Sequence, residues 1–186
     1  MRCLKFLFTG CASAARWLPV IMTFGFLLIP MTPHAQPVAE ALAPSSREWE
    51  KILPVAQNLK ADGDAATAAK KPILLFFNLT GCHYCRGALR EVIVPMFRNA
   101  GWRAALEFRQ ITIDDGKSLI DFDGKRIDTI AFAHKRKGTF APTVMVVDGD
   151  GQLLGEPLVG IANFDFYGAY VDALVNKAIA DLKARK

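Results

Sequence analysis

The fold of this 186-residue chain is decided by residues 73–85, which spell ILLFFNLTGCHYC. The unbroken apolar run Ile73–Phe77 is typical of a strand that is buried on both faces. Thr80-Gly81 then turns the chain, and a helix is predicted over His83–Arg98. A strand, a tight turn and a helix in this order place Cys82 at the first turn of the helix.

The chain beyond this stretch supplies the other elements of an α/β domain. In order, we expect a strand at Phe108–Ile113, a turn at Asp121–Lys125, a helix near Ile127–Lys137, a strand at Thr143–Val147, a hairpin turn at Asp148–Gly151, a strand at Gln152–Gly155 and an amphipathic helix near Phe164–Lys183. Strands joined by crossovers should pair in parallel, whereas the last two should form an antiparallel hairpin. The expected sheet is therefore four-stranded and mixed, with helices on its faces. A kink is expected at Pro95 of the first helix, because proline lacks the N–H that a helix needs.

Residues 36–70 are expected to hold a lead-in, one extra helix and a linker. Ser45 and Glu48 form a capping box, which marks the start of a helix. Pro54 should kink or split that helix. The apolar side of the helix would consist of Trp49, Ile52, Leu53 and Leu59. The stretch Asp62–Lys71 is polar or small and is predicted as a linker, so the α/β domain should occupy residues 71–186.

Residues 1–35 have the pattern of a secretory signal. Three basic residues and no acidic ones precede or flank the apolar run Trp17–Met31. That run of about 15 residues is shorter than the roughly 20 that a membrane-spanning helix requires. Cleavage could follow Ala35 or the small-residue triplets ending at Ala41 and Ala43, and a retained membrane anchor is the alternative. We therefore expect a periplasmic protein, either free or held at the membrane by this segment.

The basic charge of the chain is largely a property of that segment. The formal net charge is +5, and removing residues 1–35 lowers it to +2 because three basic and no acidic residues are lost. The remaining Lys and Arg are interspersed with acids, which is not the footprint of a nucleic-acid-binding protein. The hydrophobic content of 52% excludes a disordered chain.

Removing the segment also leaves two of the four cysteines, Cys82 and Cys85. An exported protein meets an oxidising compartment in which disulfides persist. A disulfide that closes so small a loop stabilises a fold little, so chemistry explains the pair better than a structural role. Unpaired N–H groups at the helix start stabilise a thiolate at Cys82, and Cys85 lies one turn further along. His83, when protonated, would add positive charge near that thiolate.

Haem and metal sites fit this pattern poorly. Covalent haem attachment needs Cys-x-x-Cys-His, but the next residue is Arg86. A structural zinc site needs four ligands, and the mature chain adds only His83 and His134, with His34 if cleavage is early. The carboxylates of one acidic segment lack the full pattern of a calcium loop: Asp114, Asp115, Asp121 and Asp123. We expect no cofactor and no resident metal.

From about Lys71 to Leu182 the chain resembles the thioredoxin superfamily, and it is most similar to secreted bacterial thioredoxin-like proteins of the SoxW type. One motif is the Cys82–Cys85 pair after a buried strand; the other is Phe140-Ala141-Pro142-Thr143 at the start of a later strand. The resemblance implies a cis Ala141–Pro142 bond beside Cys82. It also implies that the backbone before Pro142 pairs with a bound substrate strand. Without the resemblance, Pro142 is simply a proline that opens a strand.

The chain departs from typical thioredoxins at the motif itself. Gly81 stands where they have Trp, and His83-Tyr84 stands where they have Gly-Pro. Phe76 replaces the buried acid six residues before the first Cys, so proton handling should differ. We assign the tuning of the thiolate to His83 and Tyr84. The segment 114–138 exceeds a minimal connection and is predicted to shape partner choice.

The leading hypothesis is a periplasmic thiol–disulfide oxidoreductase, with a reductase role favoured. Cys82 would attack, Cys85 would resolve, and Ala141 with Pro142 would bind the substrate. Expected partners are periplasmic proteins that carry disulfides or thiols, together with a membrane electron donor. The chain is expected to be monomeric and to bind no nucleic acid. The alternatives are a binding module or chaperone with a structural disulfide, and a metal-handling protein that uses both thiols and a histidine.

Overall fold

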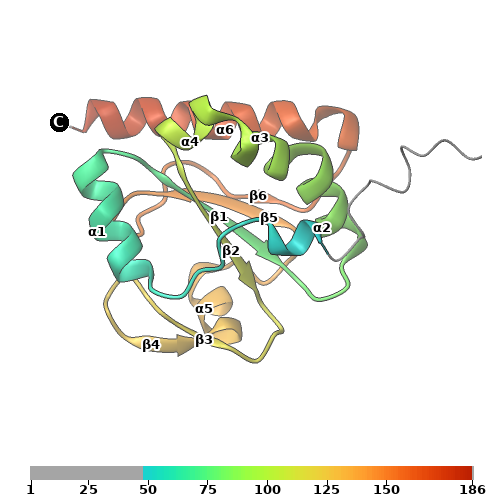
Figure 1. Cartoon of the computed structure of the whole chain (residues 1–186), viewed down its shortest axis with the longest axis horizontal. Helices are drawn as coiled ribbons and strands as arrows, with labels where there is room; N and C mark the ends of the chain where they lie inside the picture. Colours follow the sequence, from blue (N-terminus) through green and yellow to red (C-terminus); the bar gives the residue numbers. More distant parts are fainter. Residues whose placement is uncertain (1–47, 186) are drawn as a thin grey trace, which may run out of the picture. The chain divides into compact units, whose positions relative to one another are not determined.

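The computed structural model describes residues 48–185 (Figure 1). The predicted signal segment 1–35 and residue Ser45 of the predicted capping box lie outside the described residues. The description below therefore starts at Glu48.

The central sheet contains β1 (Ile73–Asn78), β2 (Glu107–Thr112), β5 (Thr143–Val147) and β6 (Leu158–Val159). Their order across the sheet is β2-β1-β5-β6. β1 pairs in parallel with β2 and antiparallel with β5, and β6 is antiparallel to β5. The predicted four-stranded mixed sheet is confirmed, and every residue of β1 is buried as expected for a central strand.

Helices cover both faces of this sheet, which creates two separate cores. The helices are α1 (Leu59–Ala69), α2 (His83–Ala88), α3 (Val94–Arg98), α4 (Ala100–Ala105), α5 (Thr129–Arg136) and α6 (Phe164–Ala184). Leu74 and Phe76 of β1 face the core shared with α2, α3 and α6, whereas Leu75 and Phe77 face the core shared with α1 and α5. Figure 1 shows α3, α4 and α6 on one side of the sheet and α5 on the other. This alternation follows from the two-residue period of a strand.

The predicted helix over His83–Arg98 is confirmed, but its irregularity lies earlier than Pro95. α2 and α3 are joined by a wider π turn at Leu89–Ile93. The ring of a proline clashes with the carbonyl four residues before it, here that of Glu91. A π turn is a known way to relieve such a conflict within a helix, so the distortion falls in the turn before the proline.

The extra N-terminal helix is displaced from its predicted position. A single 3₁₀ turn covers Trp49–Lys51, and α1 occupies the stretch predicted as a linker. Pro54 lies instead in an extended segment: Gln110 N–H donates to the Pro54 carbonyl oxygen, and Ala56 N–H donates to the Gln110 carbonyl oxygen. The edge of β2 thus holds this segment extended.

The composition of α1 follows from what it packs against. Asn58 caps the helix by accepting the N–H of Ala61. Gly63 and Ala66 are buried, and a side chain at Gly63 would collide with the carbonyl oxygen of Gly149. Small residues therefore belong to a helix that approaches the turn after β5 closely, rather than to a linker.

The long segment 114–138 forms a small sheet of its own that was not predicted. β3 (Ser118–Ile120) pairs antiparallel with β4 (Arg126–Asp128), and α5 follows. The predicted turn at Asp121–Lys125 is confirmed by the bond from Asp121 N–H to the Lys125 carbonyl oxygen.

The predicted strand at Gln152–Gly155 is wrong in its position. The turn at Asp148–Gly151 is present, with Asp148 N–H bonded to the Gln152 carbonyl oxygen. Beyond the turn, Leu153 forms an isolated bridge to Val147 and Leu154 N–H donates to the Val146 carbonyl oxygen, without forming a strand. The backbone at Gly155 has a φ of 132°, which breaks the strand geometry. The strand that pairs with β5 comes later, as β6.

Candidate functional site

Cys82 and Cys85 are joined by a disulfide at the start of α2. Cys82 is the residue that caps the helix, and its Sγ accepts the backbone N–H of Cys85 at 3.1 Å. Cys85 lies inside the helix and only 1% of its surface is exposed. Cys82 is partly exposed and packs against the edge of the same core. Cys82 is therefore the more accessible of the two cysteines, and Cys85 is shielded.

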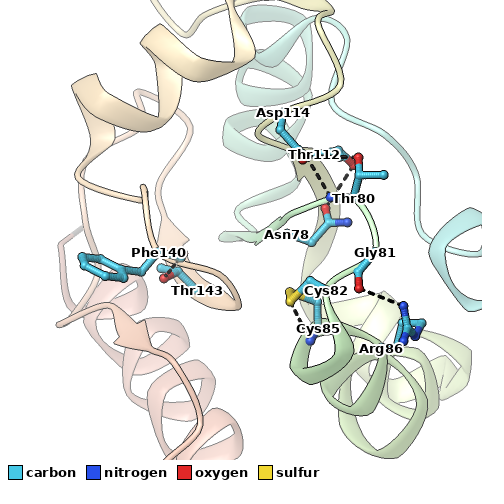
Figure 2. The surroundings of a disulfide bond; sticks show 10 residues. All are labelled: Asn78, Thr80, Gly81, Cys82, Cys85, Arg86, Thr112, Asp114, Phe140 and Thr143. Atoms are coloured by element: carbon cyan, nitrogen blue, oxygen red, sulfur yellow. Dashed lines mark hydrogen bonds between the residues drawn. A yellow bond between two sulfur atoms is a disulfide. The ribbon is translucent and has the colours of Figure 1, made fainter.

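The turn that leads into Cys82 is held from two sides, as Figure 2 shows. Gly81 has a φ of 71°, a left-handed conformation that favours glycine. The N–H and hydroxyl of Thr80 donate to Asp114 Oδ1 at 2.8 and 3.1 Å. On the other side, Arg86 Nη1 donates to the Gly81 carbonyl oxygen at 3.0 Å. These bonds fix the peptide that carries Cys82.

Buried polar groups lie at the ends of β1 and β2, next to this turn. Asn78 is buried, and its Oδ1 accepts the hydroxyl of Thr112 at 3.1 Å. Its backbone carbonyl accepts the N–H of Ile113 at 2.8 Å. On β2, the buried side-chain oxygen of Gln110 has no hydrogen-bond partner among the described residues. Gln110 pairs with Phe76, the position where typical thioredoxins carry an acid.

The contacts of Asp114, Thr80 and Arg86 that hold the turn were not predicted from the sequence. Asp114 was considered there only as part of an acidic segment that lacks the pattern of a calcium loop. A signal was present, because Thr80 follows β1 and Asp114 follows β2 by two residues each. The carboxyl ends of neighbouring parallel strands meet at one edge of a sheet, so these two side chains had to lie near each other.

The second motif lies opposite the cysteine pair (Figure 2). The Ala141–Pro142 peptide bond is cis, as the resemblance implied. The Thr143 hydroxyl donates to the Phe140 carbonyl oxygen at 2.8 Å, and Gly160 N–H donates to that of Pro142 at 2.8 Å. Ala141 packs against the core cluster that contains Cys85. Both predicted motifs are thus brought together, and the roles assigned to their residues stay predictions.

Exposed aromatic side chains lie next to both motifs. Phe140 is 71% exposed and Tyr84 is 57% exposed. The Tyr84 ring stacks on Phe164 of α6, with the ring centres 6.1 Å apart. The Phe164 ring in turn lies against Gly87, where an added Cβ would come within 2.6 Å of the ring. His83 is exposed, and its ring makes an edge-on contact with the ring of Tyr84. The influence of both residues on the Cys82 thiolate stays a prediction.

Residues 48–185 contain no group of three or more His, Cys, Asp or Glu side chains that could hold a metal ion. In particular, His134 lies in the last turn of α5, far along the chain from the cysteines. Within the same range, none of the helices is long and apolar enough to cross a membrane.

The family profile of the thioredoxin-like domain matches residues 59–174. No significant match was found among curated proteins.

The chain is also similar to solved structures. Oxidised thioredoxin O2 from Arabidopsis thaliana is 15% identical and aligns over 68% of this chain and 96% of its own, with a TM-score of 0.42. A DsbH oxidoreductase is 15% identical over 69% and 85% of the two chains, with a TM-score of 0.49. The oxidised C-terminal domain of DsbD from Neisseria meningitidis is 19% identical over 64% and 98%, with a TM-score of 0.44.

Proposed function

We propose that this chain, which belongs to the thioredoxin-like family, is a thiol–disulfide oxidoreductase that acts on partner proteins through Cys82 and Cys85. The observation that carries the proposal is the asymmetry of the cysteine pair. Cys82 is partly exposed at the helix start, and Cys85 is buried one turn behind it. An accessible sulfur that can be attacked and a shielded sulfur that can resolve are what disulfide exchange requires.

The reduction of a partner disulfide would proceed in two displacements. The Cys82 thiolate attacks one sulfur of the partner, which breaks the partner disulfide and releases its other sulfur as a thiolate that takes a proton from water. Cys85 then gives up its thiol proton to water and attacks Cys82 Sγ. This breaks the mixed disulfide and releases the second partner sulfur as a thiolate, which takes a proton from water. The partner gains two electrons and the Cys82–Cys85 pair loses them.

The local structure supports the assignment of Cys82 as the attacking group. Its Sγ already accepts a backbone N–H, and a hydrogen bond to a charged sulfur is stronger than one to a neutral sulfur. The start of α2 adds the positive end of the helix dipole. The cis Ala141–Pro142 segment opposite the pair would supply the backbone groups that align an extended partner strand.

We further propose a reductase in the periplasm, close in type to the SoxW proteins. The signal-like residues 1–35 and the resemblance of both motifs support this. Its partners would be exported proteins that carry disulfides, and a membrane electron donor would return two electrons to the pair. In the reverse direction the same residues would oxidise partner thiols, so the reduction potential decides between the two roles.

The reduction of insulin disulfides tests the catalytic assignment. We expect turnover by the wild type, none by Cys82→Ser, and a trapped mixed disulfide with Cys85→Ser. Thermal unfolding of both variants should match that of the reduced wild type, which controls for loss of fold. Turnover by Cys82→Ser would show that the assigned nucleophile is wrong.

The reduction potential separates this proposal from the alternatives. Structural disulfides have potentials below about −300 mV, whereas thioredoxin lies near −270 mV. A reduction potential of the Cys82–Cys85 pair below about −300 mV would favour a binding module or chaperone. Retention of zinc or copper by the reduced protein would favour a metal-handling role.

A further inference from the structure

Two side chains of opposite charge hold the turn that carries Cys82, and they come from different elements. We propose that Asp114 and Arg86 are opposed positioning residues that together set the stability of the Cys82 thiolate. In this inference, which rests on the proposed function, Arg86 favours the reduced pair and Asp114 disfavours it. Their balance would determine the equilibrium between the dithiol and the disulfide.

Arg86 is fixed relative to Cys82 by two hydrogen bonds. Its guanidinium donates to the carbonyl of Gly81 at 3.0 Å, and that carbonyl belongs to the peptide bond that joins Gly81 to Cys82. Its backbone N–H donates to the Cys82 carbonyl oxygen at 3.1 Å. A cation held one peptide away from a sulfur lowers the free energy of the thiolate relative to the thiol.

Asp114 acts from the opposite side, through Thr80. One carboxylate oxygen accepts both the N–H and the hydroxyl of Thr80. Thr80 lies two residues before Cys82, so this contact fixes the carboxylate next to the turn that carries Cys82. The Debye length at physiological ionic strength is about 8 Å, so the influence of both charges on the sulfur should grow as the salt concentration falls. A fixed anion raises the free energy of the thiolate.

Other charged or titratable side chains also lie near the turn. His83 directly follows Cys82 and is exposed. Gly81 and Arg86 also line a surface cleft of about 770 Å³. The remaining charged residues of that cleft balance in sign: Glu50, Lys51, Asp115 and Lys117. Lys117 pairs with Asp115 at 3.1 Å, and Asp115 also accepts the Thr129 hydroxyl. This acid next to Asp114 therefore provides a matched control.

The direction in which each variant shifts the dithiol–disulfide equilibrium distinguishes an effect of charge from simple bracing of the turn. If both side chains merely brace the turn, removing either one loosens it, and the equilibrium moves in the same direction. If their charges act on the thiolate, the two removals move it in opposite directions. Asp114→Asn keeps an oxygen that can accept from Thr80 while removing the charge, and Arg86→Gln removes the opposite charge.

The experiment measures the equilibrium of the cysteine pair with reduced and oxidised glutathione in each variant. We expect Arg86→Gln to shift it about threefold toward the disulfide and Asp114→Asn about threefold toward the dithiol. Asp115→Asn should change it less than twofold, and Arg86→Lys should restore the wild-type value. In the Cys85→Ser background, thiolate absorbance should appear at higher pH with Arg86→Gln and at lower pH with Asp114→Asn.

Shifts in the same direction, or no shift in either variant, would overturn the inference. The proposed function fails by a different result, namely the absence of insulin reduction by the wild type. If insulin is not reduced but the two shifts remain opposed, the control of the thiolate stands and the catalytic role does not.

Discussion

The cysteine end of the molecule and the ionic cluster of Asp121, Lys135 and Arg136 differ in how far their side chains are exposed. At the cysteine end, a few hydrogen bonds hold the turn before Cys82, and the nearby ring of Phe140 is largely exposed. At the ionic cluster, Asp121 is 1% exposed and pairs with Lys135 and Arg136 of α5. One region leaves side chains such as Phe140 exposed, whereas the other buries a charge and surrounds it with hydrogen-bond donors.

The ionic cluster binds three separate parts of the chain together. Arg136 donates to the Gly151 carbonyl oxygen at 2.6 Å, and its guanidinium lies 4.9 Å from the centre of the Phe122 ring. Burial acts to raise the pKa of Asp121, but hydrogen bonds from Lys135, the Phe122 N–H and Arg136 outweigh it, so the pKa lies below 3.8. The contrast implies that the stability of the fold and the proposed disulfide exchange depend on different residues.

The largest effect is expected from Gly63→Ala in α1. Alanine normally stabilises a helix by up to 1 kcal/mol relative to glycine. Here the added methyl group would collide with the Gly149 carbonyl, and we expect a loss of about 3 kcal/mol in urea unfolding. Insulin reduction per folded molecule should not change. The control Ala65→Ser, at an exposed position of the same helix, should cost less than about 0.5 kcal/mol.

The next effect concerns the buried carboxylate. Asp121→Asn leaves Lys135 and Arg136 without their shared anion and should cost about 2 kcal/mol in urea unfolding. Asp123→Asn is the matched control, because its side chain is 42% exposed and also pairs with Lys135. That control should cost less than about 0.5 kcal/mol. Equal costs for the two variants would contradict the importance of burial.

Acid should remove the contribution of Asp121. Because its pKa in the folded state is below the ordinary 3.8, its stabilisation is fully present above 3.8 and is lost as the pH falls through the lower folded value. The difference in unfolding free energy between the wild type and Asp121→Asn should therefore shrink by about 1 kcal/mol or more on acidification. A difference that stays constant down to the lowest measurable pH would show that the charge of Asp121 is not the cause.

The smallest effect on stability is expected at Phe140. Phe140→Ala removes a ring that is 71% exposed, so unfolding should change by less than about 0.5 kcal/mol. If the ring contacts the partner, exchange with insulin should slow by about threefold to tenfold. Ile130→Ala, at an exposed position on α5, should leave both quantities unchanged. An unchanged rate with Phe140→Ala would place partner binding elsewhere.

Much of the fold was predictable because its signals are local. The apolar run Ile73–Phe77 and the apolar segments predicted as later strands, Phe108–Ile113 and Thr143–Val147, indicated the central sheet. The displaced helix α1 was not predictable, because the small residues after Asp62 resemble a linker until their neighbour is known. Likewise, Pro54 breaks a helix locally, but only the edge of β2 provides the bonds that hold its segment extended.

The sequence by itself determined where the cysteine pair lies in the fold: two cysteines, three residues apart, at the start of a helix after a buried strand. Those features depend on spacing along the chain, which local physical rules can interpret. Tertiary structure alone decided what surrounds the pair. Asp114 reaches Thr80 across 34 residues, and Arg136 reaches Asp121 across 15. Such contacts depend on which strand ends and helix faces meet, and that is settled only when the two cores pack.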